Sequence, residues 1–243
     1  MRYINGKRGK IAYHQSLGKA PGVVFLGGFM SDMEGTKARH LETLCKAWGR
    51  AYLRFDYSGH GASEGKLEEG TIGGWLEDTL LVLDELTSEP QVLVGSSMGG
   101  WLMVLAALKK PSRIHGLVGI AAAPDFIEDF ERLTPEEHVS LQKDGICYIP
   151  SQYGDKPYPI TRQLIEEGHS HRVLHQTLPL DCPVRLLHGL ADHDVPWQKS
   201  IKLAACLASK DVVVTLVKEG DHRLSTASQL ELLGNCIKTL VES

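Results

Sequence analysis

The sequence lacks the patterns that mark several common classes of protein. Its 243 residues include five cysteines without a CxxC pair, which argues against both a disulfide framework and a zinc site. The formal net charge is -4, so there is no basic surplus with which to bind nucleic acid or an anionic membrane. No apolar run reaches the length of a transmembrane helix. These absences favour a protein with free thiols, no nucleic-acid partner, no transmembrane segment and a small-molecule partner.

Short apolar runs alternate with helical patterns along most of the chain. The first residues, RYINGKRGKIAYHQ, alternate around Asn5-Gly6 and Gly9 as a β-hairpin does. The later runs are continuously apolar, which is typical of parallel strands buried on both faces. The pattern predicts a single α/β domain over residues 1–243, with an open, mostly parallel sheet and helices on both faces. Strands are expected at 22–29, 51–61, 91–96, 114–124, 183–189 and 211–220, and helices at 35–49, 72–87, 98–111, 197–209 and 227–243.

One segment breaks this alternation. Residues 125–180 are charged, contain histidines and are interrupted by proline, with modest helical patterns at 135–143 and 160–168. We interpret this segment as a cap insertion between two strands of the sheet. Because such connecting segments commonly carry binding residues, we expect it to line the substrate pocket.

Two adjacent serines stand where a predicted strand meets a predicted helix, in QVLVGSSMGGW. Gly95, Ser97 and Gly99 form a Gly-x-Ser-x-Gly pattern, and this context is the one that a nucleophile elbow requires. The turn is so tight that only glycine at its two ends avoids collision with neighbouring backbone. Ser97 would point outward from the apex as a nucleophile, with Ser96 at the tolerant position. A phosphate-binding turn is the alternative, but neither a P-loop nor a GxGxxG motif is present.

A nucleophilic serine needs a base, and the base needs a carboxylate that orients it. In a fold with a nucleophile elbow, both groups follow the serine at the ends of later strands. The loop LLHGLADHDVPW offers Asp192 and Asp194 as the acid, and His222 in the loop after the last strand is the expected base. We interpret three histidines at other strand ends as loop-packing or capping residues: His60, His188 and His193.

The same chemistry requires two main-chain N–H groups that stabilise a negatively charged oxygen. Met98 follows the nucleophile and is expected to supply one of them. The loop FLGGFMSD is expected to supply the other through Phe29, because Gly27 and Gly28 let the backbone approach closely. Taken alone, this loop is equally compatible with a simple tight turn.

These segments together resemble a known family. GSSMGG, GGF, FDYSGHGASEG, HGLADHDVPW and GDHR occur in this order over nearly the whole chain and are similar to the motifs of α/β-hydrolase-fold serine hydrolases. FLGGFMSDMEGTKA, RFDYSGHG, GSSMGGWLM, PVRLLHG and VPWQ more narrowly resemble the branch that contains the mitochondrial palmitoyl-protein thioesterase, which also hydrolyses acyl glucuronides, and its bacterial relatives. The resemblance implies an α/β-hydrolase fold, a triad of Ser97, Asp192 and His222, and an oxyanion hole at Phe29 and Met98.

The choice of acid follows the family pattern HGxxDxxVP, which falls on Asp192. Asp194 stands just before Val195-Pro196, where the chain turns into the next helix, so we expect it to cap the helix or to form the turn. Asp125 is a third candidate, because some members of the family place the acid after that earlier strand.

Two pairs of side chains in the insertion are candidates for binding a ligand. His171 and His175 have an i, i+4 spacing, but no third ligand is evident, so we expect no metal site. Arg162 or Arg172 is a candidate to receive a carboxylate such as a glucuronate.

The resemblance implies hydrolysis of carboxylic esters or thioesters through an acyl-enzyme, with no cofactor. The substrate would be a small-molecule ester or acyl thioester, or an S-acylated protein. The same triad supports hydrolysis of carbon–carbon bonds, and a ligand-binding pseudoenzyme can share the fold. The N-terminal MRYINGKRGK has no apolar signal sequence, so we expect a cytoplasmic bacterial member, or a mitochondrial one from which a transit peptide has been removed.

Overall fold

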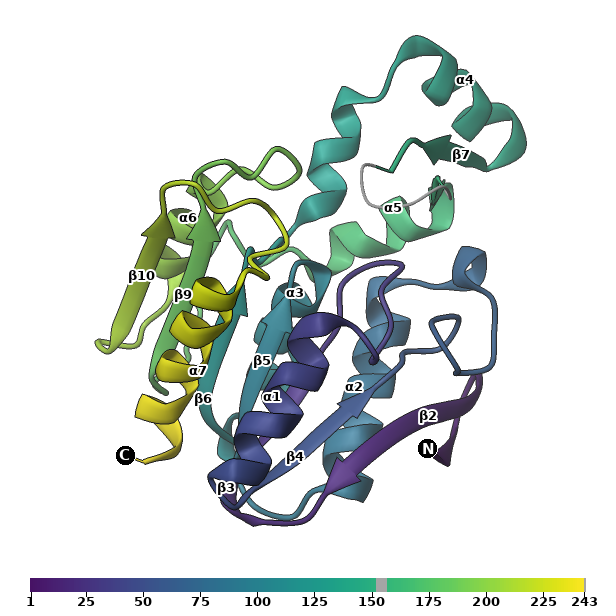
Figure 1. Cartoon of the computed structure of the whole chain (residues 1–243). Helices are drawn as coiled ribbons and strands as arrows, with labels where there is room; N and C mark the ends of the chain where they lie inside the picture. Colours follow the sequence, from purple (N-terminus) through teal and green to yellow (C-terminus); the bar gives the residue numbers. More distant parts are fainter. Residues whose placement is uncertain (152–156, 243) are drawn as a thin grey trace.

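An eight-stranded sheet forms the centre of the computed structural model, which describes residues 1–151 and 157–242 (Figure 1). Its strands are β1 (Arg2–Gly6), β2 (Gly9–Ser16), β3 (Lys19–Leu26), β4 (Arg50–Phe55), β5 (Gln91–Ser96), β6 (Ile114–Ile120), β9 (Val184–Gly189) and β10 (Val212–Val217). Their order across the sheet is β1-β2-β4-β3-β5-β6-β9-β10. The β1–β2 and β2–β4 pairs are antiparallel, and all the others are parallel. The predicted α/β fold with a mostly parallel sheet is therefore confirmed.

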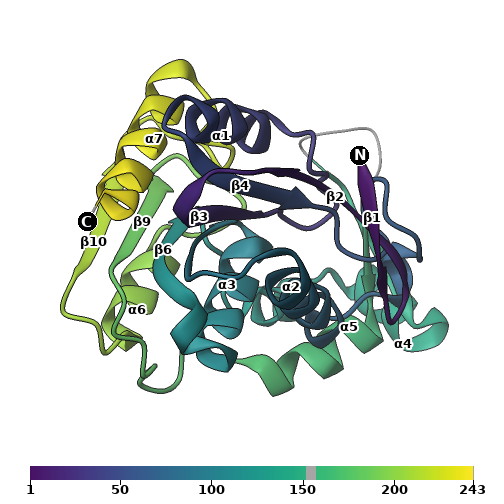
Figure 2. The ribbon, with the colours of Figure 1, turned by 90° about the horizontal axis from the view of Figure 1, so that it is seen from below.

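Helices cover both faces of this sheet (Figure 2). One face carries α1 (Thr36–Ala47) and α7 (Ala227–Val241), and the other carries α2 (Ile72–Leu86), α3 (Met98–Lys109) and α6 (Gln198–Cys206). Two short 3-10 helices, η1 (Leu67–Glu69) and η2 (Pro111–Arg113), lie in the connections. Within the described residues, none of the helices combines the length and apolar composition that crossing a membrane requires.

The central strands β3, β5 and β6 are mostly apolar because each of their faces meets a layer of helices. Side chains alternate along a strand, so Val23 and Phe25 of β3 join the core beneath α1 and α7. Val24 and Leu26 of the same strand join the core beneath α2 and α3. Burial on both faces removes the polar positions that would otherwise break the run.

The segment between β6 and β9 forms short elements outside the main sheet. They are η3 (Phe126–Arg132), α4 (Pro135–Asp144), β7 (Ile146–Ile149), β8 (Tyr158–Thr161), α5 (Arg162–Gly168) and η4 (His169–His171). β7 and β8 pair only with each other, as an antiparallel hairpin. In Figure 1 these elements rise above the carboxyl ends of the parallel strands. Residues 152–156 of the expected insertion lie outside the described part of the chain.

The helix expected at 160–168 begins later than predicted. Tyr158–Thr161 forms strand β8 instead, and α5 follows it directly. The Thr161 hydroxyl accepts a hydrogen bond from the N–H of Leu164, which makes Thr161 the N-cap of the helix. A strand of four residues is too short to show an alternating pattern. The N-cap residue Thr161 was the feature of the sequence that marked where the helix begins. The other expected helix, at 135–143, is present as α4.

The five cysteines are free thiols. Cys45 and Cys147 are buried, and the other three are half-buried. Burial raises the pKa of the Cys45 thiol to about 12, so this residue behaves as an inert apolar side chain.

Candidate active site

Ser97 stands at the tight turn between β5 and α3. Its backbone has φ 53° and ψ -120°, a conformation that is strained for a residue with a side chain. A Cβ atom on Gly95 would lie 2.3 Å from the carbonyl oxygen of Gly99, and one on Gly99 would lie 2.2 Å from that of Leu26. The two glycines therefore permit the turn, and the turn presents Ser97 at the carboxyl edge of the sheet.

The Ser97 hydroxyl meets His222, although 125 residues separate them. His222 Nε2 lies 3.1 Å from Ser97 Oγ, and His222 Nδ1 lies 2.8 Å from Oδ2 of Asp192. Asp192 lies in the loop after β9 and His222 in the loop after β10. Because an ionised carboxylate only accepts, the ring proton is on Nδ1, and Nε2 is left to accept the serine proton. This arrangement can activate the hydroxyl as a nucleophile.

Asp192 receives four hydrogen-bond contacts inside the protein, and its side chain is fully buried. Its Oδ1 accepts from the main-chain N–H groups of Asp194 and Val195, both at 2.9 Å. Its Oδ2 lies 3.1 Å from His188 Nε2, in addition to the contact with His222. Burial by itself would raise the pKa of Asp192, but the hydrogen bonds from His188 and His222 hold it well below its usual range. Asp192 is therefore an anion.

His188 is a member of this network, although its position in the sequence predicts only a loop-packing or capping residue. It is fully buried, its Nδ1 lies 2.7 Å from Ser200 Oγ, and its Nε2 lies 2.9 Å from the carbonyl oxygen of Val195. A carbonyl oxygen only accepts, so Nε2 carries the proton and shares it between Val195 and Asp192. His188 thus helps to orient the carboxylate. One feature of the sequence could have indicated this role: His188 stands at the end of a strand, four residues before Asp192.

The loop after β3 lies against Ser97. A Cβ atom on Gly28 would lie 3.3 Å from Ser97 Cβ and 4.0 Å from its Oγ. Phe29 follows Gly28, and no acceptor among the described residues is hydrogen-bonded to its N–H. Met98 is the first residue of α3, where an N–H has no acceptor within the helix. The two expected donors therefore belong to segments that meet at Ser97, and both N–H groups can stabilise an oxyanion.

Asp194 does not cap a helix, which is one of the two roles that its sequence position predicts. Its side chain is exposed, and the N-cap of α6 is Trp197, which makes no side-chain cap bond. The turn before α6 is instead stabilised by Asp192, which accepts the main-chain N–H of Asp194. Because α6 begins at Gln198 with Trp197 as its N-cap, the capping role was wrong, and Asp194 takes part in the turn through its main-chain N–H.

Asp125, the third carboxylate considered for the triad, has a different set of partners. It is buried just after β6, where it has φ 55°. Its carboxylate accepts from the main-chain N–H groups of Val173 and Leu174, at 2.8 to 3.1 Å. Asp125 therefore fastens the end of the insertion to the sheet.

The histidines of the insertion do not form the helical pair that their spacing suggested. η4 ends at His171, whose Nε2 bonds with Glu167 at 2.6 Å, and His175 lies beyond the helix. One group of ligand atoms among the described residues is compact enough to hold an ion: Asp192, Asp194 and His222. The atoms of Asp192 and His222 already bond with each other and with Ser97, so an ion there would have to break these contacts.

The two arginines considered for carboxylate binding are engaged within the insertion. Arg162 donates to the carbonyl oxygens of Leu141 and Gln142 at the end of α4. Arg172 pairs with Glu128 at 3.4 Å. Both contacts stabilise the insertion itself, and neither supports a role in substrate binding.

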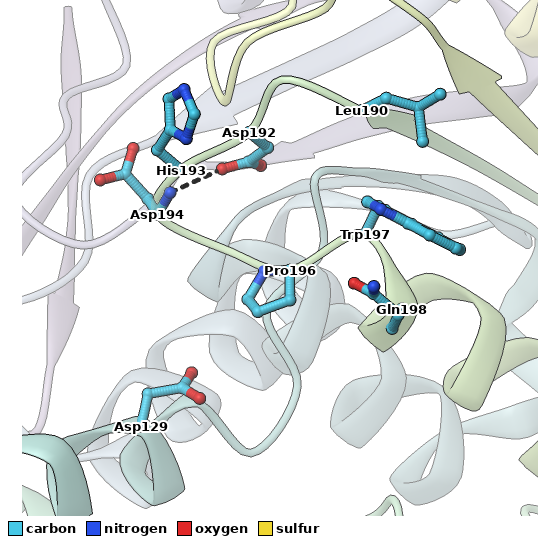
Figure 3. A pocket seen from close by; sticks show the side chains of 8 residues that line it. All are labelled: Asp129, Leu190, Asp192, His193, Asp194, Pro196, Trp197 and Gln198. Carbon is cyan, nitrogen blue, oxygen red and sulfur yellow. Dashed lines mark hydrogen bonds between the residues drawn. The ribbon is translucent and has the colours of Figure 1, made fainter.

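A cavity of about 490 Å³ lies beside the loop that carries Asp192 (Figure 3). It is lined by Asp129, Leu190, Asp192, His193, Asp194, Pro196, Trp197 and Gln198. In Figure 3, Asp129 comes from the insertion and faces the loop after β9 across the cavity. Asp129 is paired with Lys199 at 2.9 Å. The lining is mainly polar, so the cavity suits a polar group better than a hydrocarbon chain.

Comparison with known proteins finds similar sequences and structures. A family profile described as "alpha/beta hydrolase fold" matches residues 23–144. Palmitoyl-protein thioesterase ABHD10, mitochondrial, of Bos taurus is 44% identical over 234 residues, which cover 96% of this chain and 76% of that protein. The structure of alpha/beta hydrolase domain-containing protein 10 from mouse matches with a TM-score of 0.92 and 41% identity, covering 99% of this chain and 98% of the other. A putative hydrolase from Agrobacterium vitis matches with a TM-score of 0.94 and 39% identity, at the same coverage of 99% and 98%.

Proposed function

The chain belongs to the α/β-hydrolase family, and from this premise we propose that it is a serine hydrolase that cleaves carboxylic esters or thioesters through an acyl-enzyme. Ester or thioester hydrolysis follows from near relatives that are named palmitoyl-protein thioesterases. The observation that carries the finer proposal is the chain of contacts from Ser97 through His222 to the buried Asp192. This arrangement supports acyl transfer to serine, because the imidazole contacts the serine hydroxyl with one nitrogen and the carboxylate with the other.

In the proposed reaction, Ser97 Oγ attacks the acyl carbon while His222 takes the hydroxyl proton at Nε2. The N–H groups of Phe29 and Met98 stabilise the oxyanion of the tetrahedral intermediate. His222 then gives the proton to the leaving alcohol or thiol, and the acyl group remains on Ser97. Water, deprotonated by His222, attacks the acyl-enzyme, and His222 returns this proton to Ser97 Oγ as the bond to the acyl group breaks and the acid is released. Asp192 orients the imidazole throughout and stabilises its cationic form.

We also propose that residues 125–180 act as a cap over this site. The ring of Phe29 lies 6.3 Å from that of Phe126 and 5.9 Å from that of Tyr158, measured between ring centroids. All three side chains are partly exposed. Phe126 and Tyr158 provide apolar surface on the insertion next to Phe29, where an acyl chain can lie. The polar cavity beside Asp192 is the better place for the leaving group.

The substrate class is proposed from the relatives and from this surface. An S-acylated protein is a candidate because the relatives are named palmitoyl-protein thioesterases. A small-molecule ester or acyl thioester satisfies the same site. Those relatives are also named as mitochondrial, which supports the mitochondrial location considered for this chain, while the cytoplasmic location of a bacterial member stays a prediction.

Labelling with a fluorophosphonate tests the proposed nucleophile. The probe forms a phosphorus–oxygen bond with an activated serine and loses fluoride, so intact mass spectrometry counts the additions. We expect one addition to the wild type and none to Ser97→Ala. Ser96→Ala is the matched control, because Ser96 is buried in β5 and should not react. Labelling that survives Ser97→Ala and vanishes in Ser96→Ala would overturn the assignment.

A panel of substrates tests the reaction class. Esters and acyl thioesters of graded chain length, with both products identified, distinguish ester, thioester and carbon–carbon cleavage. We expect turnover of esters or thioesters that requires Ser97. Absence of both turnover and fluorophosphonate labelling would favour a ligand-binding pseudoenzyme on the same fold.

A further inference from the structure

His60 is a buried histidine beside the proposed oxyanion loop, and the reaction described above leaves it without a role. It is 3% exposed, its Nε2 lies 3.3 Å from the main-chain nitrogen of Met30, and its Nδ1 lies 3.3 Å from the carbonyl oxygen of Ser58. The N–H of Met30 only donates and the carbonyl of Ser58 only accepts, so both contacts require a neutral ring with its proton on Nδ1. Burial favours this state because it lowers the pKa of His60 to about 4.

The ring of His60 is held in place by helix α2. Trp75 Nε1 donates to the Ser58 carbonyl oxygen at 3.1 Å, and the Trp75 and His60 rings pack edge to face at 5.2 Å. The main-chain N–H and the hydroxyl of Ser58 both donate to Oδ2 of the buried Asp78, at 2.9 and 2.7 Å. The acceptor that His60 offers to Met30 is therefore rigidly placed.

Met30 has a strained backbone within a β-turn. The N–H of Ser31 donates to the carbonyl oxygen of Gly28 at 3.2 Å, so Phe29 and Met30 are the central residues of the turn. Met30 has φ 56°, which glycine adopts freely but which costs free energy for a residue with a side chain. The contact with His60 offsets part of this cost.

The turn determines where the Phe29 N–H points. The carbonyl of Gly28 and the N–H of Phe29 belong to one planar peptide group and point in opposite directions. Because the Gly28 carbonyl is directed toward Ser31, the Phe29 N–H is directed out of the turn. Positive φ at Met30 is part of this turn. If the turn opened, the Gly28 carbonyl would lose its bond to Ser31, and the peptide group that carries the Phe29 N–H would no longer be fixed.

We propose that His60 is a positioning residue for catalysis, which accepts the Met30 N–H, keeps the turn formed and so directs the Phe29 N–H at the oxyanion. The inference rests on the proposed function, since Phe29 is one of the two donors in that reaction. Loss of one oxyanion donor costs about 10² to 10³ in kcat. A misdirected donor loses part of that factor, and the loss falls on kcat more than on KM because the oxyanion forms after binding.

Three variants test the proposal by steady-state kinetics on a short activated ester, with thermal melts. His60→Leu removes the acceptor but keeps apolar volume, and we expect kcat to fall about 10- to 100-fold with little change in KM. His60→Gln offers an amide oxygen near the position of Nε2, so it should recover most of kcat. Adding Met30→Gly to His60→Leu should also recover kcat, because glycine holds the positive φ without the contact.

Thr79→Val is the matched control, because Thr79 is buried in α2 and its hydroxyl donates to the carbonyl of Trp75 in the same helix. A wild-type kcat in His60→Leu would overturn the inference. An equal loss of kcat in Thr79→Val would also overturn it. So would a loss of kcat that is restored neither in His60→Gln nor by adding Met30→Gly to His60→Leu, since these results indicate a purely structural role. Turnover that persists in Ser97→Ala would refute the proposed function and this inference with it. If the inference about His60 fails but the proposed function holds, the wild type still shows turnover that requires Ser97.

Discussion

Replacing Asp192 by asparagine is the most direct perturbation of the proposed triad, because the carboxylate serves four donors at once. Oδ1 faces the two main-chain N–H groups of Asp194 and Val195, and Oδ2 faces His188 and His222. Asparagine keeps the shape of the side chain but replaces one oxygen by an NH2 group that only donates. Whichever way the amide is turned, one of the two pairs of contacts is disrupted.

The orientation that keeps the two main-chain bonds on the amide oxygen directs the NH2 group at the histidines. One amide N–H then donates to Nδ1 of His222, which moves the ring proton to Nε2. An Nε2–H cannot accept the Ser97 proton, so general-base catalysis is lost. We expect kcat to fall by about 10⁴, which corresponds to about 5.4 kcal/mol of transition-state stabilisation.

The same NH2 group meets the Nε2–H of His188, and two donors then face each other in a buried place. A buried polar group without a partner costs about 1–3 kcal/mol. For a chain of this length, that loss lowers the melting temperature by about 2–12 °C. Asp192→Asn should therefore be less stable but folded at room temperature.

Steady-state kinetics and thermal melts of Asp192→Asn and Asp194→Asn separate these effects. Asp194 is the matched control because it contributes its main-chain N–H to the network, which the substitution keeps, so kcat should stay near the wild-type value. The reasoning is refuted if Asp192→Asn loses less than about tenfold in kcat, where about 10⁴ is expected. An equal loss in Asp194→Asn would refute it as well.

Three further substitutions have defined outcomes. Gly28→Ala brings a Cβ to 3.3 Å from Ser97 Cβ, so the serine must shift. We expect kcat to fall while the melting temperature changes little. An unchanged kcat in the kinetic assay would contradict the close approach of the two segments. Asp125→Asn replaces one of the two carboxylate oxygens that accept the N–H groups of residues 173 and 174. Calorimetry should show a melting temperature about 2–12 °C lower with unchanged kcat, and an unshifted melt would show that the contact contributes nothing. Burial lowers the pKa of His60 from 6.5 to about 4. As the pH falls, the imidazole is therefore protonated in the unfolded chain before it is protonated in the folded protein. The free energy of unfolding then decreases between pH 6.5 and pH 4, by up to about 3 kcal/mol. Denaturant unfolding above pH 6.5 and near pH 4 should show a smaller loss for His60→Gln than for the wild type, and equal losses would rule the histidine out as the cause.

The elements of the sheet were predictable because their causes are local. A strand such as β5 is continuously apolar because both its faces are covered, and the adjacent helix α3 follows from the spacing of its own residues. The turn at Ser97 was predictable for the same reason, since Gly95 and Gly99 lie within two residues of it and their missing side chains are what permit it. The order of serine, acid and base along the chain also follows from the topology.

Short elements of the insertion were predicted less well, because their stability comes from partners elsewhere. β8 pairs with β7, and neither is long enough to show a period, so the sequence pattern places residues 160–161 of this strand at the start of a helix. Arg162 was considered as a ligand for a carboxylate, but it donates to the end of α4, about twenty positions earlier in the chain. The direction in which a long side chain reaches depends on what lies beside it after folding.

What the sequence by itself determined was the set of chemical groups and the strand end at which each one stands. Only the tertiary structure decided which lone pair or N–H each group meets. Asp192 Oδ2 accepts from His222, 30 residues away, and His60 accepts from Met30, also 30 residues away. Contacts over such separations leave no periodic pattern in the chain, because the strands and helices between them determine the geometry. The fold therefore follows from local pattern, whereas the direction of each hydrogen bond at the site follows from packing.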